Sequence, residues 1–160
     1  MSDPQSRLAM FPGTFDPVTN GHLDIIRRGA ALFDLLVVGV GNNPEKASLL
    51  PQQERAALVR EVLVDLPNVR VETFEGLTVD FARRVGAGVI LRGVRSFSDL
   101  HFEYQVALTN RLAAGVETVF ILTAPQHAFT SSTLIKQMAQ MGGDVSAMVP
   151  EVVANRLRNK

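Results

Sequence analysis

Two runs of residues in this chain combine glycine, hydroxyl and basic side chains in an order that suits phosphate chemistry. The first is FPGTFDPVTNGH at residues 11–22, and the second is TSSTLIK at residues 130–136. Each run is expected where a strand or loop passes into a helix, a junction that exposes backbone N–H groups and the positive end of a helix dipole. Two such junctions, with a histidine at one and a lysine at the other, predict chemistry on a nucleoside triphosphate.

The first run supplies a candidate histidine and two glycines that make room around it. Gly13 lets a ligand approach the main chain closely, and Gly21 leaves space beside His22. An imidazole N–H at the start of a helix can bond an α-phosphate oxygen as negative charge builds in the transition state. The protonation state of His22 stays open, because a helix N-terminus disfavours the cation and a nearby phosphate favours it. Asp16 could hold a metal ion or bond backbone N–H groups in the turn, and the turn role is the expected one.

Basic residues elsewhere in the chain complete the candidate site. Arg92 follows a buried strand and offers a planar fork, whereas Lys46 lies in a polar loop and offers a mobile point charge. Together they could hold the phosphate of an attacking substrate, and Arg95 could face the triphosphate instead. The hydroxyls of residues 130–133 can bind β- and γ-phosphates, although helix capping alone would explain them. Lys136 either assists there or is a surface charge.

The segments that must position these residues alternate between strands and helices. We expect strands at residues 8–11, 35–40, 69–73, 89–91 and 119–122. We expect helices at residues 22–32, 51–63, 77–85, 99–113, 131–141 and 150–158. The alternation predicts an α/β fold, a Rossmann-like open sheet of five parallel strands with helices on both faces. Ligands of such sheets bind beyond the carboxyl ends of the strands, so Thr14, Lys46, Arg92 and Thr130 are expected on one rim.

Length and composition bound the kind of protein. A chain of 160 residues predicts one domain, residues 1–160, and 46% hydrophobic residues predict a folded globular core. Sixteen basic and sixteen acidic side chains cancel, which argues against a nucleic-acid partner. The absence of cysteine excludes disulfides, thiolate catalysis and cysteine-ligated metal. No apolar run has membrane-spanning length and residues 1–7 do not form a signal peptide, so we expect a cytoplasmic protein without a membrane partner.

Both runs resemble the signatures of the nucleotidyltransferase superfamily. Residues 19–22 are similar to T/H-x-G-H, and residues 131–136 are similar to S/T-S-S/T-x-x-R/K. The whole first run, RGVR at 92–95 and GDV at 143–145 resemble the bacterial phosphopantetheine adenylyltransferase family, and the likeness extends from about Leu8 to the last helix. The resemblance implies transfer of AMP from ATP to 4′-phosphopantetheine with Mg²⁺, giving dephospho-coenzyme A and pyrophosphate, the penultimate step of coenzyme A biosynthesis. It also implies a homohexamer, and coenzyme A as a feedback inhibitor in the same cleft.

The resemblance implies roles for individual residues as well. His22 would be the transition-state stabiliser, with Lys46 and Arg92 as further catalytic residues. The implied contacts to ATP are Thr14, Phe15, His22, Gly93, Val94, Arg95, Glu103, His127, Ala128, Phe129, Thr130, Ser131, Ser132 and Thr133. The implied contacts to phosphopantetheine are Thr14, Lys46, Thr78, Arg92 and Asn110. No protein ligand of Mg²⁺ is predicted.

Two other hypotheses stay open. Both signatures would survive if the acceptor were different, for example nicotinamide mononucleotide or the acceptor of a cytidylyltransferase. A non-catalytic, nucleotide-binding regulatory subunit belongs to another class, and the intact Gly21, His22 and 131–133 hydroxyls weigh against it.

Overall fold

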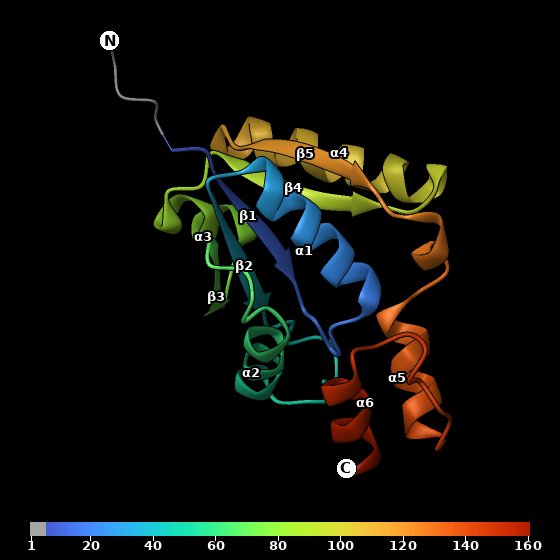
Figure 1. Cartoon of the computed structure of the whole chain (residues 1–160). Helices are drawn as coiled ribbons and strands as arrows, with labels where there is room; N and C mark the ends of the chain where they lie inside the picture. The colour runs from blue at the N-terminus through green and yellow to red at the C-terminus, as the bar shows by residue number, and fades with distance from the viewer. Residues whose placement is uncertain (1–5) are drawn as a thin grey trace.

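The centre of the computed structural model is one sheet of five parallel strands, and the structure describes residues 6–160 (Figure 1). The strands are β1 (Leu8–Gly13), β2 (Leu35–Gly41), β3 (Val69–Phe74), β4 (Val89–Val94) and β5 (Glu117–Leu122). Their order across the sheet is β3-β2-β1-β4-β5, and every neighbouring pair is parallel. This order confirms the predicted Rossmann-like α/β fold.

Helices cover both faces of the sheet. They are α1 (Asn20–Leu32), α2 (Gln52–Val62), α3 (Thr78–Val85), α4 (Phe97–Ala114), α5 (Ser132–Gln140) and α6 (Glu151–Arg158), with a short 3₁₀ helix η1 (Pro125–His127). Figure 1 shows α1 in front of the sheet and α4 behind it. Apolar side chains of α1 and α2 share the core on one face, whereas α3 packs into the core on the opposite face. Each crossover between parallel strands carries a helix, as expected.

The alternating side chains of the buried strands build two apolar cores. On β1, Phe11 packs into the core that contains Ile26 of α1 and Val59 of α2. Its neighbour Met10 packs into the opposite core, with Phe81 of α3. Successive strand residues point to opposite faces, so a strand buried on both sides must be apolar throughout.

The largest differences from the sequence-based expectation concern β4 and η1, and β1 also runs through Pro12 to Gly13, beyond its expected end at residue 11. The fourth strand was expected to end at residue 91, but β4 continues to Val94 and Arg92 pairs with Phe120 of β5. Glycine at position 93 lets α1 lie close to this end of β4, because a Cβ there would lie 3.0 Å from Cγ1 of Ile25 on α1. The helix η1 was not predicted, since a single 3₁₀ turn is too short to show a periodic pattern.

The strand order creates a crevice at the carboxyl ends of β1 and β4. The chain passes from β1 to β2 on one side, whereas the strand on the other side of β1 is β4. The segments that follow these two central strands therefore diverge, and ligands of open parallel sheets bind where this happens.

None of the helices among residues 6–160 is long and apolar enough to cross a membrane. The expectation that residues 1–7 do not form a signal peptide falls mostly on residues 1–5, which lie outside the described part of the chain.

Candidate active site

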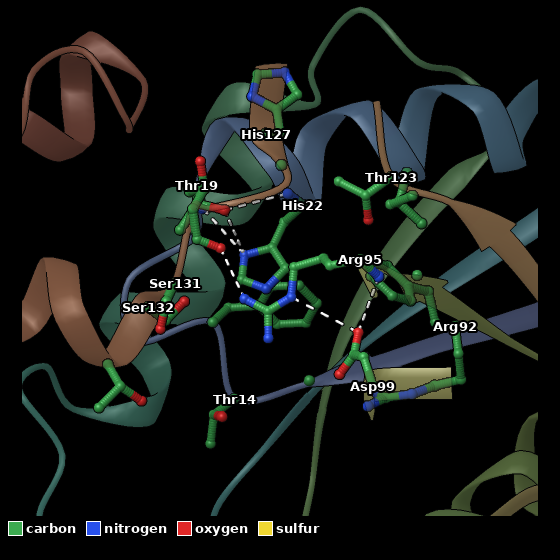
Figure 2. Close-up of a pocket in the computed structure, with 18 of the residues that line it drawn as sticks. Thr14, Thr19, His22, Arg92, Arg95, Asp99, Thr123, His127, Ser131 and Ser132 are labelled. Carbon is green, nitrogen blue, oxygen red and sulfur yellow. Dashed lines mark hydrogen bonds and ion pairs between the residues drawn. The ribbon is translucent and has the colours of Figure 1, made fainter. Parts of the chain in front are cut away.

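A cavity of about 410 Å³ opens in the crevice and brings both sequence runs together (Figure 2). The predicted site residues that line it are Thr14, Phe15, His22, Lys46, Arg92, Gly93, Arg95, Glu103, His127, Thr130, Ser131, Ser132 and Thr133. A Cβ added at Gly21 would lie 3.4 Å from Cβ of His127, which measures how closely the start of α1 approaches the segment before α5. The expected meeting of the two helix starts at one rim is thus present in the structure.

The position of His22 is fixed by the cap of α1. Thr19 is the N-cap, and its Oγ1 accepts the backbone N–H of His22 at 3.2 Å. In return, Nδ1 of His22 accepts the backbone N–H of Thr19 at 3.1 Å, which completes a capping box. Because a backbone N–H can only donate, Nδ1 carries no proton and the neutral ring carries its hydrogen on Nε2.

The surroundings of His22 keep the imidazole neutral. Burial, as the largest cause, and the positive charges of Arg92 and Arg95 together lower its pKa from 6.5 to about 4. The ring of Phe15 packs against it edge-on, with 4.9 Å between the centroids. The open question of protonation is therefore answered in the ligand-free protein: His22 offers a neutral Nε2–H donor.

Arg92 lies between the first cavity and α4, held by a buried carboxylate. Its Nε and one terminal nitrogen donate to the two oxygens of Glu103 at 2.9 and 2.7 Å, and the other donates to the Pro12 carbonyl at 3.0 Å. A guanidinium has five N–H donors, so two remain for a ligand after these three bonds. Glu103 is only 6% exposed and both its oxygens bind Arg92, so its predicted contact with ATP stays a prediction.

Arg95 connects the end of β4 with the segment before α5. One terminal nitrogen donates to the Thr130 carbonyl at 2.9 Å, and Nε lies 3.7 Å from the carboxylate of Asp99. The same carboxylate accepts the backbone N–H of Arg95 at 3.0 Å. Figure 2 shows Arg95 beside His22, with Ser131 across the cavity. Asp99 was not among the predicted site residues.

A second cavity of about 540 Å³ adjoins the first and shares five lining residues with it: Pro12, Gly13, Thr14, Arg92 and Glu103. It extends away from His22 between β1, β4 and α4. The predicted substrate contacts Thr78 and Asn110 line it, together with apolar side chains such as Leu77 and Val106. The two cavities therefore form one continuous cleft, and Thr14 and Arg92 lie where they meet.

Three residues of the predicted ATP set, Val94, Ala128 and Phe129, do not line either cavity. Val94 is buried at the end of β4, and the side chain of Phe129 is 95% exposed. Their proposed contacts would have to use the backbone or a rearranged loop, and they stay predictions.

Arg55 does not line either cavity but supports the site, and sequence reasoning missed it. It is 1% exposed on α2, and it donates to the carbonyls of Thr14, Gly41 and Leu50. The bond to the Thr14 carbonyl thereby holds the turn after β1 in place. A signal existed, since Arg55 lies at helical spacing four residues before the buried Val59 and thus on the apolar face of α2.

The acidic side chains of the first cavity are engaged by basic ones. Residues 6–160 contain no group of three or more histidine and acidic side chains that could hold an ion. The carboxylates that line the first cavity, Asp99 and Glu103, are each paired with an arginine.

A parallel α/β sheet with a histidine in the first turn of α1 and a hydroxyl cluster at the start of α5 defines a nucleotidyltransferase, and the cytidylyltransferase-like family model matches residues 10–138. The phosphopantetheine adenylyltransferase of Caldanaerobacter subterraneus subsp. tengcongensis is 50% identical over 155 residues, which cover 96% of this chain and 97% of the relative. This chain belongs to the phosphopantetheine adenylyltransferase family.

Further comparisons agree with this assignment. The phosphopantetheine adenylyltransferase of Xylella fastidiosa (strain 9a5c) is 50% identical over 159 residues, which cover 99% of this chain and 98% of the relative. The crystal structure of a putative nicotinate-nucleotide adenylyltransferase from Vibrio parahaemolyticus matches with a TM-score of 0.72 over 97% of this chain and 93% of its own. At 21% identity, that second likeness concerns the fold alone.

Proposed function

We propose that this protein transfers AMP from ATP to 4′-phosphopantetheine and so forms dephospho-coenzyme A and pyrophosphate. The observation that carries this proposal is the pair of joined cavities, which meet at Thr14 and Arg92. One cavity offers a helix start and hydroxyls to a triphosphate, and the other offers apolar walls to a long, mostly uncharged arm. Their meeting point is where the acceptor phosphate and the α-phosphate of ATP have to react.

ATP would lie in the first cavity with its α-phosphate at His22. The backbone N–H groups and hydroxyls of residues 131–133 would bind the β- and γ-phosphates, aided by Arg95. The phosphate of phosphopantetheine would lie between Lys46 and Arg92, where the two unused N–H donors of the guanidinium remain. Its arm would then extend through the second cavity toward Thr78 and Asn110.

The reaction is an in-line displacement at the α-phosphorus. An oxygen of the acceptor phosphate forms a bond to this phosphorus, and the bond to the oxygen that bridges to the β-phosphate breaks. Pyrophosphate leaves with that electron pair. A phosphate dianion needs no general base, so a neutral His22 whose Nδ1 is already bonded serves only to donate Nε2–H to the α-phosphate. Catalysis is then mostly positioning and charge stabilisation.

Mg²⁺ belongs to the substrate in this proposal and enters as MgATP. The protein contributes the arginines, lysine and helix starts around the phosphates.

The remaining proposals concern the protein in the cell. We propose a cytoplasmic homohexamer, on the strength of the family resemblance. Coenzyme A contains the same arm and an adenylate, so it fits the same continuous cleft and can act as a feedback inhibitor there. Size-exclusion chromatography with light scattering measures the assembly, and competition between coenzyme A and each substrate measures the inhibition.

The acceptor decides between this function and its alternatives. Purified protein is incubated with MgATP and, separately, phosphopantetheine, nicotinamide mononucleotide or no acceptor, and the products are identified by mass spectrometry. We expect dephospho-coenzyme A and pyrophosphate only with phosphopantetheine. Adenylylation of nicotinamide mononucleotide instead would identify another acceptor class, and binding of ATP without any product would favour the regulatory subunit. The variant His22→Ala, prepared in the same way, controls for a contaminating enzyme.

A further inference from the structure

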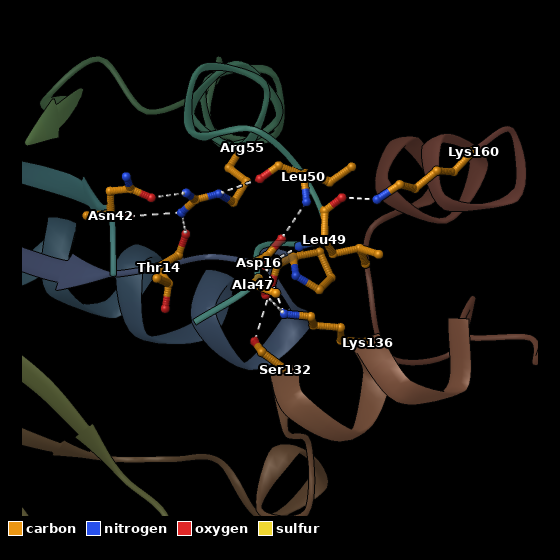
Figure 3. A network of polar contacts seen from close by, with 12 residues as sticks. Thr14, Asp16, Asn42, Ala47, Leu49, Leu50, Arg55, Ser132, Lys136 and Lys160 are labelled. Carbon is orange, nitrogen blue, oxygen red and sulfur yellow. Dashed lines mark hydrogen bonds and ion pairs between the residues drawn. The ribbon is translucent and has the colours of Figure 1, made fainter. Parts of the chain in front are cut away.

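The carboxylate of Asp16 joins three segments that also carry lining residues of the first cavity: its own turn, the segment that carries Lys46, and α5 (Figure 3). Asp16 lies in the turn after β1, and its two oxygens accept the backbone N–H groups of Leu49 at 2.7 Å and Leu50 at 3.0 Å. Its side chain is 11% exposed, so these bonds are largely shielded from water. The expected turn role of Asp16 is thus extended, because the amides it binds belong to the distant segment that carries Lys46.

Lys136 on α5 binds the same carboxylate from the other side. Its Nζ lies 3.5 Å from Oδ2 of Asp16 and also donates to the carbonyl of Ala47, the residue next to Lys46. A lysine ammonium has three donors, and the surrounding protein takes two of them. Lys136 does not line either cavity. Of the two roles considered from the sequence, assistance to the triphosphate and a surface charge, neither describes this contact.

We propose that Asp16 and Lys136 are a positioning pair that sets the distance between Lys46 and the start of α5. This inference rests on the proposed function, in which Lys46 binds the acceptor phosphate and the start of α5 binds the phosphates of ATP. Lys136 touches no substrate. It acts through the segment 46–50, which it ties to the same turn that carries Thr14 and Phe15.

The start of α5 and the segment around Lys46 differ in the other contacts that hold them in place. The start of α5 keeps the cap of Ser131, the bond from Ser132 Oγ to the Pro17 carbonyl at 3.1 Å, and the fully buried side chain of Ile135. The segment that carries Lys46 is anchored at its end by the buried side chains of Leu49 and Leu50, whose carbonyls accept from Lys160 and Arg55. Residues 44–48 before it are exposed, so their position depends more on Asp16 and on the bond from Lys136 to the Ala47 carbonyl. Loss of Lys136 should therefore displace Lys46, whereas residues 131–133, which would bind the phosphates of ATP, should keep their positions.

The first test measures the pair without any substrate. The variants are Lys136→Met, Lys136→Arg as the conservative replacement, and Arg27→Met as a matched control that breaks the exposed ion pair with Asp65. Hydrogen exchange is followed at the Leu49 and Leu50 amides. We expect about tenfold faster exchange in Lys136→Met, with Lys136→Arg and Arg27→Met close to the parent, because local opening follows the loss of local contacts. Unchanged exchange in Lys136→Met would overturn the proposal.

The second test separates the two substrates by calorimetry and steady-state kinetics. In Lys136→Met we expect about tenfold weaker binding of phosphopantetheine and lower kcat, with ATP affinity within about threefold of the parent. Asp16→Asn should behave alike, and the double variant should be no worse than the worse single one, because both act through one contact. ATP binding weakened about tenfold with AMP binding unchanged would instead make Lys136 a triphosphate ligand and contradict the pair. If no phosphopantetheine binds even to the parent protein, the proposed function fails while the exchange experiment still judges the pair.

Discussion

Arg92 on β4 and Glu103 on α4 form a bidentate ion pair, in which each carboxylate oxygen lies within 2.9 Å of a guanidinium nitrogen. Glu103 is almost fully buried, whereas the Arg92 side chain is one-third exposed and lines both cavities. The pair thus holds one edge of the guanidinium and leaves its remaining donors at the point where the cavities meet. Arginine suits this place because its planar fork can bind a carboxylate and a phosphate together.

Glu103→Gln tests whether this pair positions Arg92. The amide keeps the size of the side chain but can accept only one of the two N–H bonds, so the guanidinium loses its fixed orientation. We expect kcat to fall about tenfold. The KM for phosphopantetheine should stay within about threefold, because removing a carboxylate near the acceptor phosphate offsets the lost alignment. Glu117→Gln, which removes an exposed ion pair with Arg111, is the control. A raised KM for ATP with unchanged kcat would instead support the nucleotide contact expected from the sequence.

Arg92→Ala and Arg95→Ala should separate the two substrates. We expect the first variant to raise the KM for phosphopantetheine about tenfold or more and the second to do the same for ATP, since each removes charge-assisted hydrogen bonds to one phosphate. Steady-state kinetics with each substrate varied in turn gives both values. Thermal unfolding is measured first, because Glu103 loses its partner in Arg92→Ala. Equal effects of either variant on both substrates would contradict the proposed division of the cleft.

His22→Ala removes the donor assigned to the α-phosphate. We expect kcat to fall about 10²–10³-fold or more, as for other transition-state donors, while the affinity for ATP stays within about threefold. His101→Ala, which changes an exposed histidine of α4, should leave both values unchanged. Rapid-quench and equilibrium-binding measurements separate the two quantities. Turnover close to that of the parent would remove His22 from the mechanism.

The lowered pKa of His22 predicts how stability depends on pH. The folded protein keeps this histidine neutral down to a pKa of about 4, whereas the unfolded chain binds a proton near 6.5. Between these values the unfolded state holds more protons, so this contribution to stability is complete above pH 6.5 and is lost as the pH falls toward 4. The melting temperature is compared at the two ends of this range for the parent and His22→Gln, whose side chain can still accept at the capping box. The parent should lose roughly 5–10 °C more than the variant, and parallel curves would contradict the shift.

Much of the fold followed from the sequence because its signals are local. Apolar runs marked the interior strands, and the alternation with helices fixed a parallel sheet whose ligands bind at one edge. The same logic predicts that Thr14, Lys46, Arg92 and Thr130 share one rim, and all four line the first cavity. A one-turn element such as η1 has no period to detect, and the end of β4 depends on the pairing of Arg92 with Phe120.

Contacts between distant side chains could not be predicted in this way. Lys136 meets Asp16 across 120 residues of sequence, and only the packing of α5 against the turn after β1 brings them together. Arg92 and Glu103 lie on different elements, so no helical or strand period relates them. Residues that line the cleft could therefore be predicted from the sequence, whereas the hydrogen bonds and ion pairs between them could not.

The meeting of both helix starts around one triphosphate is tested most directly by a crystal structure of the protein with phosphopantetheine and a non-hydrolysable analogue of MgATP. We expect an α-phosphate oxygen within about 3 Å of His22 Nε2, with the β- and γ-phosphates at Ser131–Thr133 and the acceptor phosphate between Lys46 and Arg92. A triphosphate bound away from residue 22, or an acceptor phosphate that points away from the α-phosphorus, would contradict the account.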